Sequence, residues 1–290
     1  MSNWADDSRL LIDIAAAADA IGVHRLCVHD HVVLTDEVDS YVYGSFPHTP
    51  AVPWLEATSM LAAFAVATRQ IRLCTRILIA PLRTAVLLAK TWATLDSLSG
   101  GRMDLGVGMG WHRPEYDASG LDFRARRQLL SETIGACRAL WSEMPAKYDG
   151  QHIRFEGIYC SPKPVQKRPP VFFSGRLNEE NIDRIVQLGD GWITSPGAGI
   201  EEIRRGTADL RSCAPGRIEV QAQVSAERGP SQKVDIAASF APVPALIGAG
   251  VTDVNVALGS FCDKPRDAFG VMQTLMDEFT ECSARTIATV

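Results

Sequence analysis

The stretch that decides the fold is residues 88–111, LAKTWATLDSLSGGRMDLGVGMGW. Its first half has the apolar spacing of an amphipathic helix that ends near Leu98, and a Ser-Gly-Gly turn follows at 99–101. Residues 103–110 then form an apolar run of strand length. A helix, a glycine turn and an apolar strand are the unit from which a parallel sheet covered by helices is built.

The same alternation continues on both sides of this stretch and gives seven strand-plus-helix units. A chain of 290 residues is close to the length of a TIM-type (β/α)8 barrel, so we expect an α/β barrel forming a single domain over 1–290. The proline-rich region at about 111–170 is expected to be an insertion or lid. Strands are predicted at 26–33, 71–80, 103–110, 171–174, 191–194, 218–225 and 253–258, and helices at 7–21, 55–68, 85–98, 123–142, 179–188, 200–212, 234–247 and 267–282.

Composition favours a small-molecule partner. The net charge is −5 and no basic run is present, which argues against nucleic acid, and no apolar stretch is long enough to cross a membrane. The seven cysteines form no close pair, so they are expected to be buried thiols in a reducing cytoplasm, and the amino end shows no export signal.

Three motifs carry candidate chemistry. Gly106, Gly108 and Gly110 leave one side of a strand end without side chains, so that a flat ring can approach the backbone; close packing of strand against helix is the alternative. Their spacing and position do not match the GxGxxG dinucleotide fingerprint.

The second motif is Ser174-Gly175-Arg176-Leu177-Asn178, which lies at a predicted strand end just before a helix. Free backbone amides, the helix dipole and the arginine predict a phosphate site at this turn. An ordinary turn with Asn178 as the helix N-cap is the alternative.

The third motif is His29-Asp30-His31. On a strand the two histidines face one way and the aspartate the other. A histidine suits proton exchange near neutral pH, whereas hydrogen bonds to neighbouring backbone would make both histidines structural.

The 88–111 block resembles the bacterial luciferase-like superfamily, in particular its branch that uses coenzyme F-420. Further similar segments follow in the expected order: VHDHVV at 28–33, PKPVQ at 162–166, PPVFFSG at 169–175 and LGDGW at 188–192. The resemblance implies a luciferase-like barrel and hydride transfer between the deazaflavin and an unidentified small organic substrate. A homodimer is a further possibility to test.

The resemblance also implies roles for individual residues. It assigns His31 to the coenzyme's redox carbon and the 174–178 turn to the coenzyme's phosphate, and it places Asp30, Ile77, Gly108 and Gly110 among the coenzyme contacts. Relatives have a cis peptide near the third strand's end, where this chain carries Arg76 in place of a small residue. Trp111 stands where relatives that oxidise a sugar phosphate carry a glutamate, so that substrate is not expected.

The family's usual first strand is missing, because the first predicted helix begins by about residue 7. An open barrel exposes two strand edges. The β-branched tail at 286–290 is therefore a candidate to close the ring, with a frayed end, a mis-called start or a partner's strand as the alternatives.

Three other functions remain open. FMN in place of F-420 would make the chain a monooxygenase, and a coenzyme-free descendant would be a binding or pathway-accessory protein. His29-x-His31 is also similar to the first metal pair of barrel amidohydrolases, but the later strands supply no matching ligands, so no metal is expected.

Overall fold

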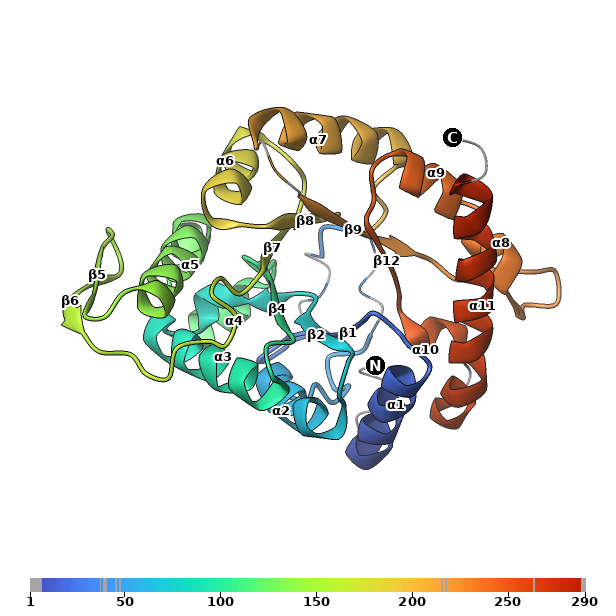
Figure 1. Cartoon of the computed structure of the whole chain (residues 1–290), viewed down its shortest axis with the longest axis horizontal. Coiled ribbons are helices and arrows are strands. Elements are labelled where there is room, and N and C mark those ends of the chain that lie inside the picture. The colour runs from blue at the N-terminus through green and yellow to red at the C-terminus, as the bar shows by residue number, and fades with distance from the viewer. Residues whose placement is uncertain are drawn as a thin grey trace.

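The computed structural model describes residues 7–36, 38, 41–44, 46, 48–214, 216, 218–262 and 264–287. Its centre is a curled parallel sheet with the strand order β1-β2-β4-β7-β8-β9-β12 (Figure 1), and the short β3 pairs with β4. Within the described residues, all seven expected strand positions are occupied, so the predicted barrel class is confirmed. The strands are β1 (Arg25–Val28), β2 (Arg72–Thr75), β3 (Leu78–Ile79), β4 (Met103–Gly108), β7 (Val171–Ser174), β8 (Gly191–Ile193), β9 (Glu219–Val224) and β12 (Asp253–Val256).

The long helices lie on the outer face of this sheet (Figure 1). They alternate with the strands along the chain, as the sequence pattern predicted. The helices are α1 (Ser8–Ala20), α2 (Ala57–Ala67), α3 (Ala85–Ser99), α4 (Arg113–Ala118), α5 (Arg126–Ser142), α6 (Glu179–Leu188), α7 (Ile200–Cys213), α8 (Ile236–Phe240), α9 (Val243–Gly248), α10 (Leu258–Phe261) and α11 (Ala268–Ile287), with 3-10 turns η3 (Ala80–Leu82), η4 (Phe123–Ala125) and η5 (Pro265–Asp267).

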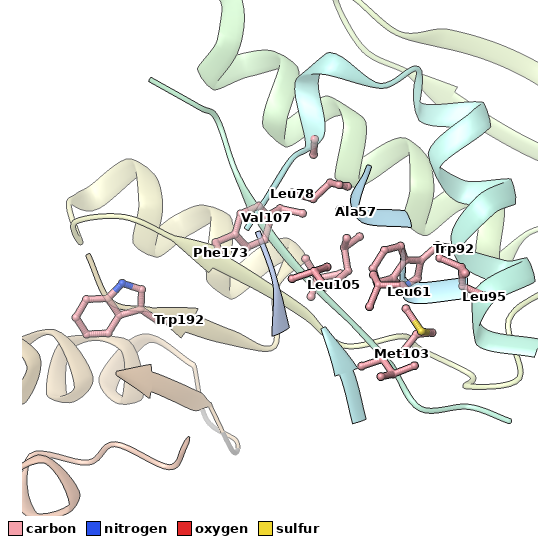
Figure 2. Close-up of a cluster of buried hydrophobic side chains, with 14 of the residues drawn as sticks. Ala57, Leu61, Leu78, Trp92, Leu95, Met103, Leu105, Val107, Phe173 and Trp192 are labelled. Carbon is pink, nitrogen blue, oxygen red and sulfur yellow. The ribbon is translucent and has the colours of Figure 1, made fainter. Parts of the chain in front are cut away.

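The main core fills the layer between the sheet and these helices. Figure 2 shows Trp92, Leu61 and Leu105 gathered between α3, α2 and β4, and all three are fully buried. Burying one such side chain contributes about 1.5–3 kcal/mol. A smaller cluster of Cys74, Phe172 and Ile193 is separate from this core. Side chains alternate between the faces of a strand, so this second cluster lies on the inner face of the sheet.

The Ser-Gly-Gly-Arg turn between α3 and β4 is held by Arg102. Its guanidinium donates to the carbonyl oxygens of Ser99, Ala65 and Thr68, at 2.7, 3.0 and 3.1 Å. Gly100 and Gly101 both have positive φ, at 70° and 85°, which a residue with a side chain adopts at a cost. Arg102 therefore has a structural role, joining this turn to the end of α2.

Among the described residues no strand pairing joins β1 with β12; side chains connect them instead, and we call this place the seam. The Arg25 side chain, 3% exposed, donates to Asp104 at 2.8 Å and Glu219 at 3.0 Å, and it also bonds Asp253. Arg72 adds a second arginine to the buried Asp104 carboxylate at 2.5 Å. We call these five residues the ion network.

The prediction that the carboxyl-terminal tail closes the barrel is wrong for the residues the structure describes. Thr286 and Ile287 continue α11, and residues 288–290 lie outside the described part. The β-branched residues cost a helix only about 0.7 kcal/mol each or less, which a long helix packed on α9 and α8 easily outweighs.

Proline divides the helix predicted at 234–247. The chain instead forms β11 (Val234–Asp235), α8 and α9, and Pro242 stands at the N-cap of α9. Proline has no N–H and its ring clashes with the preceding turn, so α8 cannot continue through it. The short β11 pairs with β10 (Glu227–Arg228).

The predicted insertion forms a hairpin of β5 (Ala146–Asp149) and β6 (Arg154–Ile158) at the outer side of α5 (Figure 1). Glu132 of α5 anchors it by accepting from the backbone amides of His152 and Ile153 at 2.8 and 2.9 Å. The part of the insertion that reaches the strand ends is the segment just after Trp111.

Among the described residues, no helix combines the length and the apolar character needed to span a membrane. The expectation of buried cysteines is confirmed for five of the seven, whereas Cys27 is half-buried and Cys213 is exposed; the buried ones are Cys74, Cys137, Cys160, Cys262 and Cys282.

Candidate functional site

The residues predicted to be functional follow the carboxyl ends of β1, β2, β4 and β7. In a barrel of parallel strands these ends lie at one face, which is where barrel enzymes carry their active sites. The structure therefore brings the three predicted motifs to the same face of the molecule.

His31 lies beyond the end of β1, next to a buried carboxylate. Its Nδ1 is 3.2 Å from Oε2 of Glu115, and the other oxygen of Glu115 accepts from the backbone amide of Val32 at 2.8 Å. Glu115 is fully buried and belongs to the first turn of α4. The sequence interpretation did not identify Glu115.

Aromatic rings surround the His31 imidazole. The ring centroids of Trp54, Phe46 and Trp111 lie 4.8, 5.8 and 5.9 Å away, each with its plane nearly perpendicular to the imidazole. Tyr41 continues the group, 5.1 Å from Trp111. We call Tyr41, Phe46, Trp54 and Trp111 the aromatic enclosure; it offers apolar surface and ring edges around His31, and His48 also packs against Phe46 and Trp54.

Asp30 is buried, but β1 ends at Val28, so the prediction that residues 29–31 lie on a strand with both histidines facing one way is wrong. Its carboxylate accepts from the backbone amide of Ile79 at 2.9 Å and from the Arg83 guanidinium at 2.5 and 2.8 Å. These donors occupy both oxygens. Asp30 therefore holds β3 and η3 against the end of β1, and the predicted coenzyme contact is not provided by a free carboxylate.

His29 faces a different environment from His31. Desolvation by the surrounding protein lowers the pKa of His29 to about 3. The positive charge of Arg76 also lowers this pKa, whereas a hydrogen bond with the Arg76 backbone raises it. His29 is nevertheless exposed to water. With this lowered pKa, His29 is neutral over the physiological range.

The end of β2 carries the cis peptide that the resemblance implied, between Arg76 and Ile77. The Arg76 side chain is buried and reaches Oε1 of Gln221 on β9 at 3.5 Å. Arg76 therefore occupies the position for which the resemblance implied a small residue, and the peptide bond that follows it is still cis.

The glycines of β4 are needed for close packing. A Cβ at Gly106 would stand 2.0 Å from the Thr75 carbonyl oxygen, and a Cβ at Gly108 would stand 2.9 Å from Ile77. At Gly110 the same atom would meet Ile79 at 2.9 Å. The packing alternative thus explains Gly106, and Ile77 lies over the position that a flat ring was predicted to approach at Gly108.

The turn after β7 is partly committed to the fold. The Gly175 amide donates to the Ile193 carbonyl at 3.2 Å, and the Asn178 side chain caps α6 by accepting from the Asn181 amide at 2.9 Å. Within the described chain, the amides of Arg176 and Leu177 have no protein acceptor.

The remaining features of this turn suit a phosphate group. Gly175 has a φ of +121°, and only the Asn181 amide nitrogen, at 3.9 Å, lies near the place of a Cβ. Arg176 is exposed. Open backbone and a free cation at a helix start are what an anionic coenzyme requires, so these residues fit such a group.

No cluster of three or more His, Cys, Asp or Glu suited to a metal ion occurs in the described part of the chain.

Comparison with known proteins identifies a family. Residues 5–245 match the model of the luciferase-like monooxygenase family. An uncharacterised protein of Mycobacterium tuberculosis is 40% identical over 144 residues, which is 50% of each chain. An FMNH2-dependent dimethylsulfone monooxygenase of Pseudomonas putida is 30% identical over 162 residues, 55% of this chain and 44% of that one. The chain spans about half the length of the curated relatives it matches.

Solved structures show the same fold. A monooxygenase from Streptomyces bottropensis superposes with a TM-score of 0.79 at 18% identity, over 94% of this chain and 93% of that one. The coenzyme F-420-dependent tetrahydromethanopterin reductase of Methanopyrus kandleri gives 0.66 at 16% identity, over 94% and 96%.

Proposed function

Because the chain belongs to the luciferase-like monooxygenase family, we propose that it is an oxidoreductase that transfers a hydride between coenzyme F-420 and a small organic substrate. The observation that carries this proposal is His31, held by Glu115 and ringed by the aromatic enclosure at the carboxyl ends of the strands. His31 gives or takes the proton that accompanies the hydride.

The coenzyme would be held at the two places where this face is open. The turn from Ser174 to Asn178 binds its phosphate through the amides of Arg176 and Leu177 and the Arg176 side chain. Ile77, which covers Gly108, would contact the coenzyme ring between that turn and His31. Bound F-420 supplies a carbon that donates or accepts a hydride, and the protein's contribution is to position it and to exclude water.

The substrate is apolar or carries a carbonyl group. The enclosure presents ring surface, and the Glu115 carboxylate beside it is fully buried and already contacts His31 and the Val32 amide. A cationic substrate group would lose its hydration at these rings, and Glu115 is not free to pair with it.

FMN is the second candidate coenzyme. Similarity to the FMNH2-dependent dimethylsulfone monooxygenase favours it, and the phosphate turn serves FMN equally well because both coenzymes carry a phosphate.

A titration tests the proposal. Purified protein is titrated with oxidised F-420 and, separately, with FMN, while coenzyme absorbance and fluorescence are followed; we expect saturable binding of F-420 and weaker binding of FMN. Reduced F-420 should then be oxidised when apolar ketones or enones such as 2-cyclohexen-1-one are added. Tighter binding of FMN selects the monooxygenase, and binding of neither coenzyme contradicts the proposal.

A homodimer is part of the proposal. Val66 of α2 and Leu87 and Leu98 of α3 are exposed apolar residues on two helices that contact each other. Sedimentation should show a dimer for the wild type and a monomer for Leu87→Glu. A monomeric wild type contradicts it.

A further inference from the structure

The buried carboxylate of Glu115 is the observation from which this inference starts. An ionised carboxylate taken out of water is costly unless donors replace its hydration. Glu115 is fully buried and meets two: the Val32 amide at 2.8 Å on one oxygen and Nδ1 of His31 at 3.2 Å on the other. Neither partner carries a permanent charge.

This contact determines which nitrogen of His31 carries the proton. An ionised carboxylate can only accept hydrogen bonds, so the nitrogen that faces it must be Nδ1–H. In the neutral ring, Nε2 then has the free lone pair. Nε2 is therefore the atom that can take up or release a proton while the bond to Glu115 stays intact.

The aromatic enclosure keeps the ring in this orientation. Trp54, Phe46 and Trp111 stand nearly perpendicular to the imidazole at 78°, 86° and 80°. A flip of the imidazole that exchanged its two nitrogens would have to displace these rings, and Phe46 and Trp111 also pack against each other.

We propose that Glu115 is a positioning residue that holds His31 in the Nδ1–H form and presents Nε2 as the proton-exchanging atom of the site. The proposal rests on the function assigned to His31 above. It differs from a purely structural role, in which Glu115 only ties α4 to the segment after β1 and the tautomer of His31 has no consequence.

The substitution Glu115→Gln separates these roles because it keeps the size of the side chain. The amide oxygen still accepts from Val32, so the amide NH2 must face Nδ1 and donate to it. The proton then moves to Nε2. A matched control is Glu132→Gln, which alters another buried carboxylate that accepts backbone amides, far from His31.

The tautomer is read by long-range ¹H–¹⁵N NMR of the histidine side chains in the coenzyme-free protein, with the His31 signals identified by their loss in His31→Gln. We expect protonated Nδ1 in the wild type and in Glu132→Gln, and protonated Nε2 in Glu115→Gln. A wild-type His31 protonated at Nε2, or an unchanged tautomer in Glu115→Gln, overturns the proposal.

Turnover of reduced F-420 with 2-cyclohexen-1-one separates this inference from the function on which it rests. Glu115→Gln should lower kcat by about 10²-fold or more with little change in KM, as expected for a misplaced proton. If His31→Ala loses turnover and Glu115→Gln does not, the role of Glu115 is overturned and that of His31 stands. If neither variant loses turnover, the proposed function itself fails.

Discussion

Two fully buried carboxylates, one at each end of the barrel, have different hydrogen-bond partners. Asp104 lies near the amino ends of the strands and bonds two arginines, Arg25 and Arg72, at 2.8 and 2.5 Å. Glu115 lies at the carboxyl ends and bonds a histidine and a backbone amide. Both carboxylates are equally inaccessible, so burial alone does not distinguish a structural end from a functional one.

The difference lies in the partners. An arginine stays charged at every physiological pH. Arg25 also bonds the carboxylates of Glu219 and Asp253, so the charged groups of the ion network pair with one another. The imidazole of His31 can gain or lose a proton and retains a second nitrogen. We infer that the residues near the amino ends of the strands stabilise the fold, whereas those at the carboxyl ends carry the proposed chemistry. Substitutions at the first end should lower stability, and substitutions at the second should lower turnover.

The strongest test of this separation is Arg25→Ala at the seam. The substitution leaves Asp104 with one arginine and removes the connection from β1 to Glu219 and Asp253. Breaking a buried ion pair costs about 3–5 kcal/mol, so the free energy of unfolding from urea denaturation should fall by that amount. Arg124→Ala, with its side chain 87% exposed, should change it by less than about 0.5 kcal/mol. If both variants lost equally little unfolding free energy, the seam would not depend on Arg25.

The opposite end is tested by His31→Ala. Loss of a general acid or base lowers turnover by about 10²–10⁴-fold, whereas the free energy of unfolding should fall by only about 1–3 kcal/mol, because one of the two contacts of buried Glu115 is removed. Steady-state oxidation of reduced F-420 and a melting curve are measured on the same preparation. Retained turnover, or a melting temperature that falls as for Arg25→Ala, would place His31 with the structural residues.

A smaller effect is expected at the phosphate turn. Arg176→Ala should weaken F-420 binding by about tenfold, since one charge-assisted hydrogen bond contributes about 1.5–3 kcal/mol and this side chain is exposed. Coenzyme fluorescence titration gives the dissociation constant, and stability should not change. Arg205→Ala, on α7, is the control, and equal weakening by both variants would indicate a general charge effect.

The smallest effect concerns Glu56, the N-cap of α2. Partial burial alone raises its pKa, but hydrogen bonds from Ser59 and Thr58 outweigh this and bring the pKa to about 2. A lowered pKa means that the stabilisation is fully present above the unfolded value of 4.5 and is lost as the pH falls towards 2.

Glu56→Gln should therefore be less stable than the wild type by about 1 kcal/mol or less at pH 7. The difference in unfolding free energy should shrink between pH 4.5 and 2, as denaturant curves at several pH values would show. A difference that stays constant over that range would mean that the charge of Glu56 contributes nothing to the cap.

The strand positions could be predicted because each is an apolar run bounded by turn residues. Residues 103–110, for example, can only be a buried strand once the preceding helix and Gly100 are assigned. The tail could not be predicted in the same way. Thr286 and Ile287 favour a strand locally, but the packing of α11 on neighbouring helices decides their conformation, and sequence alone does not give that packing.

Site residues that lie within one short sequence motif could be predicted. Residues that the fold brings to the site from distant parts of the chain were missed. His31 and the turn at Gly175 each lie in a short signature. Glu115 and Trp54 are far from His31 in sequence, and they meet it only because the segments after β1 and β4 converge at the same face. An acidic residue in the first turn of a helix also has an ordinary explanation in the helix dipole, which concealed Glu115.

The central claim is that the carboxyl-terminal face binds the coenzyme beside His31, and a crystal structure with F-420 bound tests it most directly. The account predicts that the coenzyme's phosphate contacts the amides of Arg176 and Leu177 and that its ring lies against Ile77, within reach of Nε2 of His31. The claim would be contradicted if the coenzyme bound at the seam or on the outer helices and made no contact with the Gly175 turn.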